Sequence, residues 1–380
     1  MPLIAAGTVV LEQGVCRPGW VHTADTAIVG CGAGPAPGVP DVDLPDATIV
    51  PGFVDIHVHG GGGGSYIIGD IPEITAAANF HREHGTTTTL ASLVTAAPVE
   101  LLAGVRRLAD ATRTGLIAGI HLEGPWLSVG QCGAHDRAQM RDATSAEIDA
   151  LLDAADGTIR MVTLAPERAG SDDAIEQLVD AGVVVALGHT DATYEQTRRA
   201  IDLGATVGTH LFNAMRPLHH REPGPALALL EDPRVTVELI ADGVHVHPAV
   251  VHATVRAAGA DHVALVTDAT AAAGAPDGEY QLGAVPVDVV DGVARVRGTP
   301  TIAGSTATMD RVFATAAGFG PDRDAALLAA VQLSSTTPAQ ALGLHRVGSL
   351  RVGNEANVVV LQSDWRISAV MAQGSWLAGN

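Results

Sequence analysis

Eight strand-like runs alternate with helical segments in the middle of this chain of 380 residues. Each run is apolar over most of its length, as expected for strands that are buried on both faces of a parallel sheet. The segments between them space their apolar residues as helices do, begin with Ser, Thr, Asp or Pro, and end at glycine. The runs, between residues 49 and 268, are IVPGFVDIHV, TTTTLASLV, GLIAGIHL, IRMVTLA, VVVALGH, TVGTHLF, VTVELIA and HVALVTD.

This alternation predicts an α/β fold, a (β/α)8 barrel of the TIM type. A doubly wound sheet is the alternative, but no GxGxxG motif follows the first run. The runs near the two chain ends are short and are separated by glycine and proline turns, which is typical of small sheets. We therefore expect a catalytic barrel over residues 51–342 and a small β-sandwich domain that residues 1–50 and 343–380 build together.

Composition excludes several kinds of chemistry. All 22 basic residues are arginine, which excludes mechanisms that need lysine, such as Schiff bases, pyridoxal phosphate anchors and lysine-derived metal bridges. The net charge of −20 argues against a nucleic-acid surface, which needs clustered cations. The three cysteines lack the spacing of disulfides or metal sites, and no membrane span or secretion leader is evident. We therefore expect a cytoplasmic protein.

Metal-type side chains stand at the ends of five of the eight runs. The active site of a (β/α)8 barrel lies at the carboxyl ends of its strands, so these side chains are expected to meet at one rim. The period of a strand puts His57 and His59 on one face, and the five glycines after them are expected to keep the mouth open to a ligand. For the HxH motif alone, a pair of core histidines is the alternative. The candidate metal ligands are His57, His59, Glu123, His189, His210 and Asp268.

Imidazole and carboxylate donors without thiolates favour Zn²⁺, with Fe²⁺, Mn²⁺ or Co²⁺ as alternatives. The site suits one or two ions, and two ions would need an anionic bridge, for which Glu123 is the best-placed carboxylate. His121 shares the strand face of Glu123 and could compete, although a role behind the ligands or against substrate is favoured. Asp268 is expected to act as a general base towards water, with a turn-capping role as the alternative.

Loops after the third, sixth and seventh runs add polar groups to the same rim. The basic loop THLFNAMRPLHHREPG suits a phosphate, but its arginines could instead pair with Glu222, which is the interpretation that we favour for Arg216. In IADGVHVH, His245 is a candidate substrate contact, whereas the second histidine before the proline could simply start the next helix. Cys132 and His135 lie on the loop after the third run, and either could contact substrate or merely occupy the loop.

Seven motifs together resemble the N-acetylglucosamine-6-phosphate deacetylases of the amidohydrolase superfamily. They are PGFVDIHVHG, HLEGPWL, GHTDATYEQ, THLFNAMRPLHHREPG, IADGVHVHP, VTDAT and IAGSTATMD. HLEGPW together with THLFNAM is specific, whereas HxH marks only the superfamily. The resemblance runs from about residue 48 to the C-terminus.

The resemblance implies a cytoplasmic homodimer that removes acetate from the 2-acetamido group of the sugar phosphate. It implies that Glu123, His189 and His210 hold one metal. Some members lack the histidine pair of the first strand and bind a single ion, so its presence here makes a second ion plausible. The metal, with help from His135, would polarise the acetamide carbonyl, and Asp268 would move the proton from the attacking water to the leaving amine.

The resemblance also implies a binding site for the sugar phosphate. Its residues would be His135, Asn213, Ala214, Arg221 and His245, with Arg221 commonly reaching in from the neighbouring subunit.

Two alternatives remain open. The first is another amidohydrolase activity, in particular a deacetylase of a related N-acyl amino-sugar phosphate such as N-acetylgalactosamine 6-phosphate. Within this alternative, composition excludes the lysine-bridged subgroups, of the dihydroorotase or hydantoinase type, and an adenosine deaminase would not need the arginine-bearing loop. The second is a non-catalytic scaffold barrel, but such relatives usually lose metal ligands, and here every ligand position is filled.

Overall fold

The computed structural model describes residues 2–377. These residues form two compact units. One unit holds the N-terminal segment up to Asp55, His81–Thr88 and the segment from Met309 onwards. The other holds Ile56–Phe80 and Thr89–Thr308, and it contains all the candidate ligands. The domain boundaries expected from the sequence stay a prediction.

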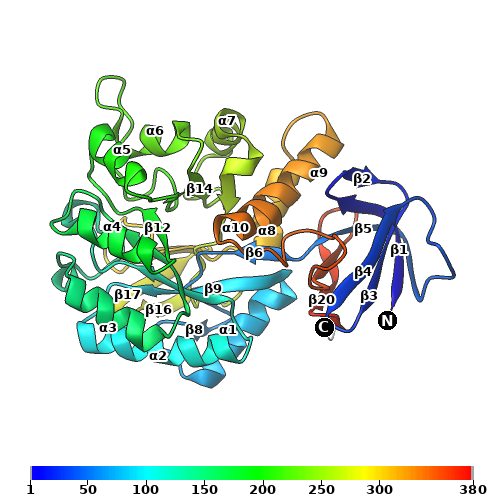
Figure 1. Ribbon diagram of the computed structural model, residues 1–380, viewed down its shortest axis with the longest axis horizontal. Coiled ribbons are helices and arrows are strands. Elements are labelled where there is room, and N and C mark those ends of the chain that lie inside the picture. Colours follow the sequence, from blue (N-terminus) through cyan, green and yellow to red (C-terminus); the bar gives the residue numbers. More distant parts are fainter. Residues whose placement is uncertain (1, 378–380) are drawn as a thin grey trace. The chain divides into compact units, whose positions relative to one another are not determined.

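The eight predicted runs all contain strands of one sheet (Figure 1). These strands are β6 (Phe53–Asp55), β9 (Thr86–Val94), β10 (Gly119–Glu123), β11 (Ile159–Leu164), β12 (Val184–Leu187), β13 (Val207–Gly208), β14 (Thr236–Leu239) and β15 (Val263–Leu265). Their order across the sheet follows the chain, and neighbouring strands from β9 to β15 pair in parallel. This is the order of a (β/α)8 barrel, and it confirms the predicted fold.

Backbone hydrogen bonds close the barrel between its first and eighth strands. Val58 and Ala269 form a parallel bridge. The amide of Asp268 donates to the carbonyl of His57 at 2.9 Å, and the amide of His59 donates to that of Ala269 at 2.8 Å. The segments that carry three of the candidate ligands are therefore fastened to each other.

Helices connect successive strands and surround the sheet in Figure 1. They are α1 (Ile71–Glu83), α2 (Pro98–Arg113), α3 (Ser145–Ala155), α4 (Ser171–Asp180), α5 (Tyr194–Asp202), α6 (Gly224–Glu231) and α7 (Pro248–Ala258). Local sequence explains where they begin. Thr193 and Gln196 form a capping box at the start of α5, and Thr144 accepts a hydrogen bond from Glu147 at the start of α3.

The run IVPGFVDIHV, predicted as one barrel strand, is divided at Gly52. Its first residues belong to β5 (Val42–Pro51), which is part of a different sheet. A Cβ atom at Gly52 would lie 2.1 Å from the Oγ1 of Thr87, so the backbone can pass there only without a side chain. The sequence pattern is continuous across this point, and the prediction of a single strand was wrong.

The five glycines after His59 were expected to keep the mouth open to a ligand, which was wrong. They form a small antiparallel hairpin, β7 (Gly60–Gly61) with β8 (Gly64–Ser65), and none of them lines the cavity beside the candidate ligands. The amides of Gly60 and Gly63 donate to carbonyls of the segment after β15, at 3.0 and 2.8 Å. Glycine is needed here for close backbone packing, because a Cβ at Gly60 would lie 2.4 Å from the carbonyl oxygen of Gly64.

Strands from both chain ends share one eight-stranded sheet. Its strands are β1 (Leu3–Leu11), β2 (Gly14–Cys16), β3 (Gly19–Ala24), β4 (Ala27–Ala33), β5, β19 (Val358–Leu361), β20 (Ile367–Ala372) and β21 (Ser375–Trp376). Strand β5 joins the two ends, because it pairs in parallel with β1 and antiparallel with β19. The core of the sheet is apolar and includes Ile4, Val21, Ile49 and Val360.

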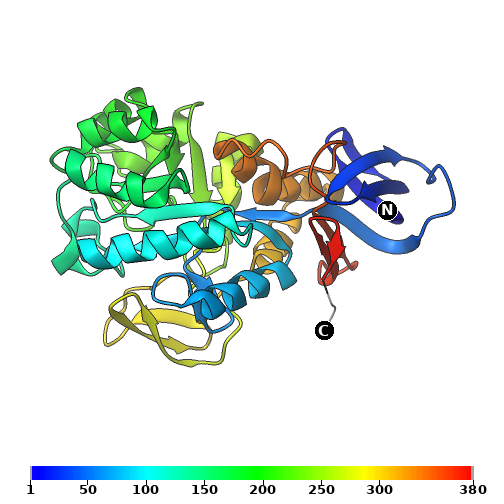
Figure 2. The ribbon, with the colours of Figure 1, turned by 60° about the horizontal axis from the view of Figure 1, so that its bottom comes forward.

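A small antiparallel sheet follows the eighth strand of the barrel. The three-stranded sheet consists of β16 (Gly278–Leu282), β17 (Val285–Val290) and β18 (Val293–Val296), shown in yellow in Figure 2. Its apolar side packs on residues of the barrel loops, among them Ile67 and Ala134. The chain then continues into the helices α8 (Met309–Ala317), α9 (Arg323–Val331) and α10 (Thr337–Ala341).

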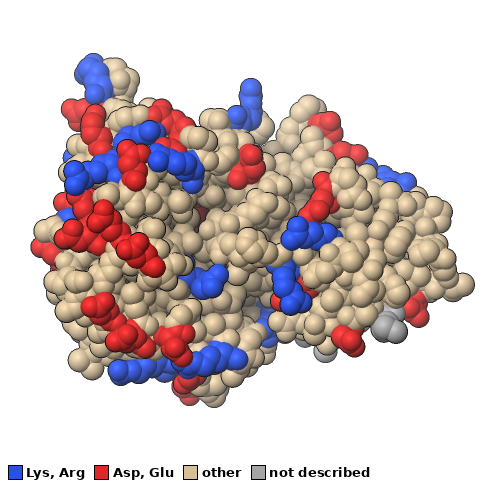
Figure 3. Space-filling model, in the orientation of Figure 1, with Lys and Arg blue, Asp and Glu red and all other residues tan. Residues whose placement is uncertain are grey.

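Charged side chains of both signs are interspersed on the face shown in Figure 3. All the basic ones are arginine, since the chain has no lysine. Within residues 2–377, none of the helices combines the length and the apolar character that crossing a membrane requires.

Candidate active site

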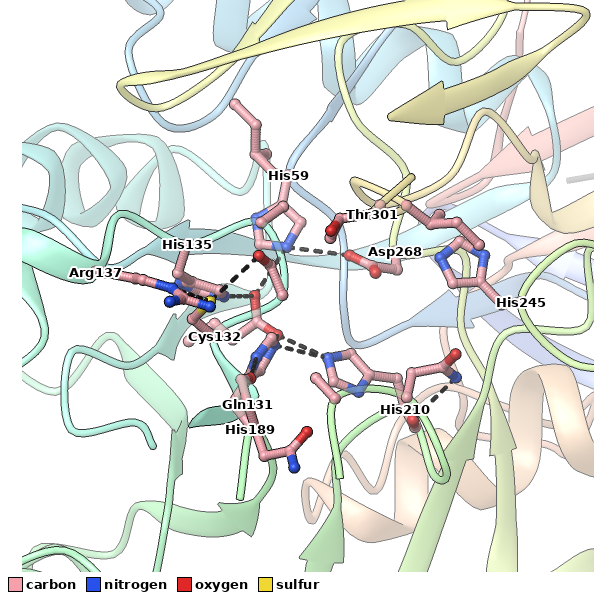
Figure 4. Close-up of a pocket in the computed structure, with 18 of the residues that line it drawn as sticks. His59, Gln131, Cys132, His135, Arg137, His189, His210, His245, Asp268 and Thr301 are labelled. Atoms are coloured by element: carbon pink, nitrogen blue, oxygen red, sulfur yellow. Dashed lines mark hydrogen bonds and ion pairs between the residues drawn. The ribbon is translucent and has the colours of Figure 1, made fainter. Parts of the chain in front are cut away.

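The six predicted ligands lie together beside a cavity of about 460 Å³. In Figure 4, the side chains of His59, His189, His210 and Asp268 point towards one centre from different strands. Their ligand atoms form two groups that share one carboxylate. The first group is His57, His59 and Glu123, and the second is Glu123, His189 and His210, each with ligand atoms within 4.8 Å of one another.

The separations between ligand atoms fit bound cations. The Nε2 atoms of His57 and His59 are 3.2 Å apart, and those of His189 and His210 are 3.1 Å apart. Four ligands at zinc–nitrogen distances would be about 3.3 Å from each other in a tetrahedral site. Two unprotonated nitrogens repel at this distance unless a cation lies between them, so the donor set fits a metal.

Hydrogen bonds at the far side of the rings fix the protons of two ligand histidines. Nδ1 of His59 lies 3.2 Å from the carbonyl oxygen of Ser92, and Nδ1 of His189 lies 2.9 Å from that of Gln131. A carbonyl oxygen can only accept, so each neutral ring carries its proton on Nδ1. The lone pair of Nε2 is therefore free and directed at the centre.

Glu238 is a buried carboxylate behind the site that sequence reasoning missed. It lies in β14 and is fully buried. Its Oε2 accepts from Nδ1 of His57 at 3.0 Å and from the backbone amide of His210 at 3.1 Å. The sequence did contain a signal for it, because Glu238 is an acidic residue inside the apolar run VTVELIA. Burying an unpaired charge there would cost free energy, so a partner was to be expected.

Glu123 lies between the two groups. Its Oε1 is 3.0 Å from Nε2 of His189, 3.0 Å from Nε2 of His210 and 3.5 Å from Nε2 of His57. Its Oε2 is 3.3 Å from Nε2 of His59. Burial would raise the pKa of Glu123, but the surrounding imidazoles, His57 foremost, hold it well below its usual value. An ionised carboxylate in this position can bridge two cations.

Asp268 flanks the first group. Its Oδ1 is 3.2 Å from Nε2 of His59 and 3.6 Å from Nε2 of His57. Burial would raise the pKa of Asp268, but the charge of His57 and the hydrogen bond from His59 keep it well below its usual value. This side chain is therefore an ionised carboxylate at the cavity wall.

The two histidines of the first group bind protons strongly in the absence of metal. Burial would lower the pKa of His57, but the charges of Glu123, Glu238 and Asp268 raise it well above its usual value. For His59, hydrogen bonds with Asp268 and Glu123 outweigh burial and raise the pKa to about 9. A cation that binds here must displace protons.

Left-handed backbone conformations cluster at the site. His189, His210 and Asp268 have φ values of 47°, 29° and 49°, and Phe212 and Ala214 follow with 78° and 48°. Such conformations are uncommon for residues other than glycine and persist where the surroundings impose them. The strands thus end in sharp turns that place these ligands at the rim.

His135 faces the cavity as a hydrogen-bond donor. The amide of Thr95 donates to its Nδ1 at 3.2 Å, so this nitrogen carries no proton. Its Nε2–H then donates to Oε2 of Glu123 at 3.1 Å. Burial lowers the pKa of His135 to about 4, which keeps the ring neutral. This tautomer suits a donor to substrate oxygen and not a metal ligand.

Three of the predicted substrate residues beyond His135 line the same cavity: Asn213, Ala214 and His245. Nδ1 of His245 lies 2.8 Å from Oδ2 of Asp242, so the ring donates its Nδ1 proton to the carboxylate. Its Nε2 is left for another partner. Sequence reasoning missed the apolar part of the wall, where Leu282 and Ile302 stand, because they come from the three-stranded sheet and the loop after it.

Arg221 and Cys132 differ in their relation to the cavity. Arg221 is exposed, does not line the cavity of its own chain, and donates to Nε2 of His220 at 2.8 Å. Cys132 lines the cavity, and its sulfur accepts from Nε of Arg137 at 2.9 Å. Cys132 is not part of either group of ligands.

His121 lies behind the ligands. It is fully buried, with Nδ1 2.9 Å from Oγ of Ser92 and Nε2 2.8 Å from Oγ1 of Thr163. Burial and the charge of His57 push its pKa well below the usual value. Both ring nitrogens are engaged, so His121 does not compete for metal.

Two rim residues have structural roles. Arg216 pairs with Asp191 at 3.1 Å and not with Glu222 as expected, because its loop turns back towards the segment after His189. The side chain of His247 accepts from the amide of Ala249 and caps α7, in line with the simpler interpretation of this histidine.

Comparisons with known proteins agree with this geometry. The model of the Amidohydrolase family matches residues 48–377. The solved structure of a mutant N-acetyl-D-glucosamine-6-phosphate deacetylase from Mycobacterium smegmatis, in complex with N-acetyl-D-glucosamine-6-phosphate, is 55% identical, with a TM-score of 0.97 over 99% of this chain and 98% of that one.

Curated relatives carry two names. N-acetylglucosamine-6-phosphate deacetylase of Vibrio furnissii is 36% identical, over 88% of this chain and 84% of that protein. N-acetylgalactosamine-6-phosphate deacetylase of Shewanella sp. (strain ANA-3) is 34% identical, over 99% of this chain and 95% of that protein. The chain therefore belongs to the amidohydrolase family and, within it, to the N-acetylglucosamine-6-phosphate deacetylases.

Proposed function

We propose that this protein hydrolyses N-acetylglucosamine 6-phosphate to glucosamine 6-phosphate and acetate in a metal-dependent reaction. The single observation that carries the proposal is the position of Glu123, whose carboxylate oxygens lie 3.0–3.5 Å from the Nε2 atoms of all four candidate histidine ligands. The substrate bound to the similar Mycobacterium smegmatis enzyme supports the choice of sugar phosphate.

The chain's own residues define where metal would bind. We propose that Glu123, His189 and His210 would hold one ion, and that His57, His59 and Glu123 would hold a second. Zn²⁺ fits a set of imidazole and carboxylate donors without thiolates, and Fe²⁺, Mn²⁺ and Co²⁺ are the alternatives. When bound, the cation polarises the acetamide carbonyl and lowers the pKa of a water.

Asp268 is the proposed acid and base. It is ionised, so it can take a proton from the water as the oxygen forms a bond to the acetyl carbon. It then returns the proton to the sugar nitrogen as the C–N bond breaks, which releases a neutral amine. His135, with its proton fixed on Nε2, donates a hydrogen bond to the carbonyl oxygen as negative charge develops there.

The phosphate is assigned to polar groups at the rim. We propose Asn213, Ala214 and His245 of one chain together with Arg221, which reaches the site of a second chain in a homodimer. The support is that Arg221 is exposed and lies outside the cavity of its own chain. A cytoplasmic location fits the three free cysteines.

Acetate release measured beside metal content tests the proposal. We expect rapid release from N-acetylglucosamine 6-phosphate and release slower by at least about 100-fold from the unphosphorylated sugar, because the groups proposed to bind the phosphate would lose their partner. N-acetylgalactosamine 6-phosphate is the third substrate to assay, since a curated relative is named for it. Equal rates with and without phosphate would contradict the phosphate site, and no release from any sugar by the metal-loaded protein would contradict the function.

A further inference from the structure

Glu238 contacts both groups of candidate ligands from behind. It lies in β14 between the buried residues Val237 and Leu239, and its Oε2 accepts from Nδ1 of His57 and from the amide of His210. We propose that Glu238 is a positioning residue, which holds the proton of His57 on Nδ1 and thereby gives the His57 and His59 group its affinity for a cation.

The surroundings of Glu238 do not explain its charge otherwise. Burying a carboxylate is costly unless a cation compensates it. Among the described residues, its one ion-pair partner is His57, at 3.0 Å. Its other oxygen, Oε1, is buried and has no hydrogen-bond partner within residues 2–377. A glutamate in this apolar environment contributes little to core packing, which favours a role in the candidate site.

The Nδ1 partner of His57 differs from the Nδ1 partners of His59 and His189. His59 and His189 donate their Nδ1 protons to neutral backbone carbonyls, at 3.2 and 2.9 Å. His57 donates its proton to a carboxylate at 3.0 Å. An anionic partner makes an imidazole a stronger metal ligand and fixes its orientation more firmly than a carbonyl does.

Two carboxylates lie at opposite edges of the His57 ring. Oε1 of Glu123 is 3.5 Å from Nε2, which faces the other candidate ligands. Oε2 of Glu238 is 3.0 Å from Nδ1, at the opposite edge of the ring. The contact of Glu238 with His210 goes to the backbone amide, so it does not set the proton of that ring. Loss of the charge at Glu238 should therefore weaken the His57 and His59 group selectively.

Zinc titration of the metal-free protein tests this inference, which rests on the metal centre of the proposed function. The wild type, Glu238→Gln and the matched control Glu167→Gln are stripped of metal and titrated against a competing chelator. Glu167 is suitable because it accepts from Thr190 and from the amide of Asp191, beside a ligand, without contacting an imidazole. The readout is the number of ions bound and the dissociation constant of each, so a failure of the deacetylase assay would leave this test intact.

We expect two ions in the wild type and in Glu167→Gln. In Glu238→Gln, we expect one ion to bind as in the wild type and the other to bind about 10–100-fold more weakly. The same substitution in a His57→Asn background should produce no further loss, because the residue through which Glu238 acts is gone. Melting temperatures of the metal-free proteins check that each variant is folded.

Four results would overturn the inference. They are wild-type affinity for both ions in Glu238→Gln, an equal loss at both ions, a single ion in the wild type, and a further loss in the His57→Asn background. If Glu238→Gln does not fold, Glu238→Asp replaces it, since it withdraws the carboxylate from Nδ1 by one methylene. Unchanged binding of the second ion in that variant would also overturn the inference.

Discussion

The two groups of ligands around Glu123 are built in different ways. His57 and His59 are two residues apart on one continuous segment, and they are surrounded by carboxylates that raise their pKa values. His189 and His210 come from separate strands, and each sits at a sharp turn with positive φ. Neighbouring carboxylates position the histidines of the first group, whereas backbone conformation positions those of the second. We therefore expect metal binding by the first group to depend on pH and on substitutions that remove charge. We expect the second group to bind metal more tightly.

Removing the shared carboxylate should have the largest effect, because it breaks both groups at once. We expect Glu123→Gln to lose most of its metal and to be slower by about 10⁴-fold or more, since the metal contributes several kcal/mol to catalysis. Metal analysis and acetate release measure this. Retention of both ions with full activity would show that the two groups do not depend on a bridge.

Substitution of Asp268 should affect turnover without removing the metal. We expect Asp268→Asn to reduce turnover by about 10³-fold, because a general acid and base contributes on this scale. The ion at Glu123, His189 and His210 should remain, which metal analysis of the same sample checks. Near-normal turnover would remove Asp268 from the proposed role.

Single histidine substitutions compare the two groups directly. We expect His59→Asn to keep one ion and to lose about 10–100-fold in turnover, because only the weaker group is damaged. The matched variant His189→Asn should lose more, since it damages the firmer site. The reverse ranking in ion content and turnover would mean that the first group is the principal metal site.

The pH dependence of stability should distinguish metal-free from metal-loaded protein. The pKa of His59 is raised to about 9 in the folded metal-free protein, against about 6.5 in an unfolded chain. Its protonation therefore stabilises the fold fully below about pH 6.5, and this contribution is lost as the pH rises through about 9. We expect the melting temperature of the metal-free protein to fall by a few degrees between pH 6.5 and 9.5.

Calorimetry of the metal-free protein, with zinc-loaded protein as the control, measures this difference. Zinc replaces the protons, so stabilisation by zinc should grow over the same interval, and metal uptake below about pH 9 should release protons. A flat melting temperature in the metal-free protein would show that His59 does not hold a proton in the fold.

The barrel and the meeting of the candidate ligands at its rim could be predicted from the sequence, because both depend on local pattern. His57 and His59 share a face by strand period alone, and Asp268 ends an apolar run. The break at Gly52 could not be predicted, because it depends on contact with Thr87 from another segment. The same holds for Arg216, whose partner is Asp191 and not the nearby glutamate.

The missed parts of the site depend on tertiary structure in the same way. Leu282 reaches the cavity wall only because β16 folds back over the barrel loops. Glu238 was detectable as a charge in a buried run, but its function becomes visible only when its partner His57, from the first strand, is placed beside it.

The most direct test of the central claim is a crystal structure of the zinc-loaded protein, with the ions located by anomalous scattering. We predict two peaks, one between His57 and His59 and one between His189 and His210, with Glu123 coordinating both. A single peak between His189 and His210 would contradict the two-group account. Peaks that lie away from Glu123 would contradict the proposed site as a whole.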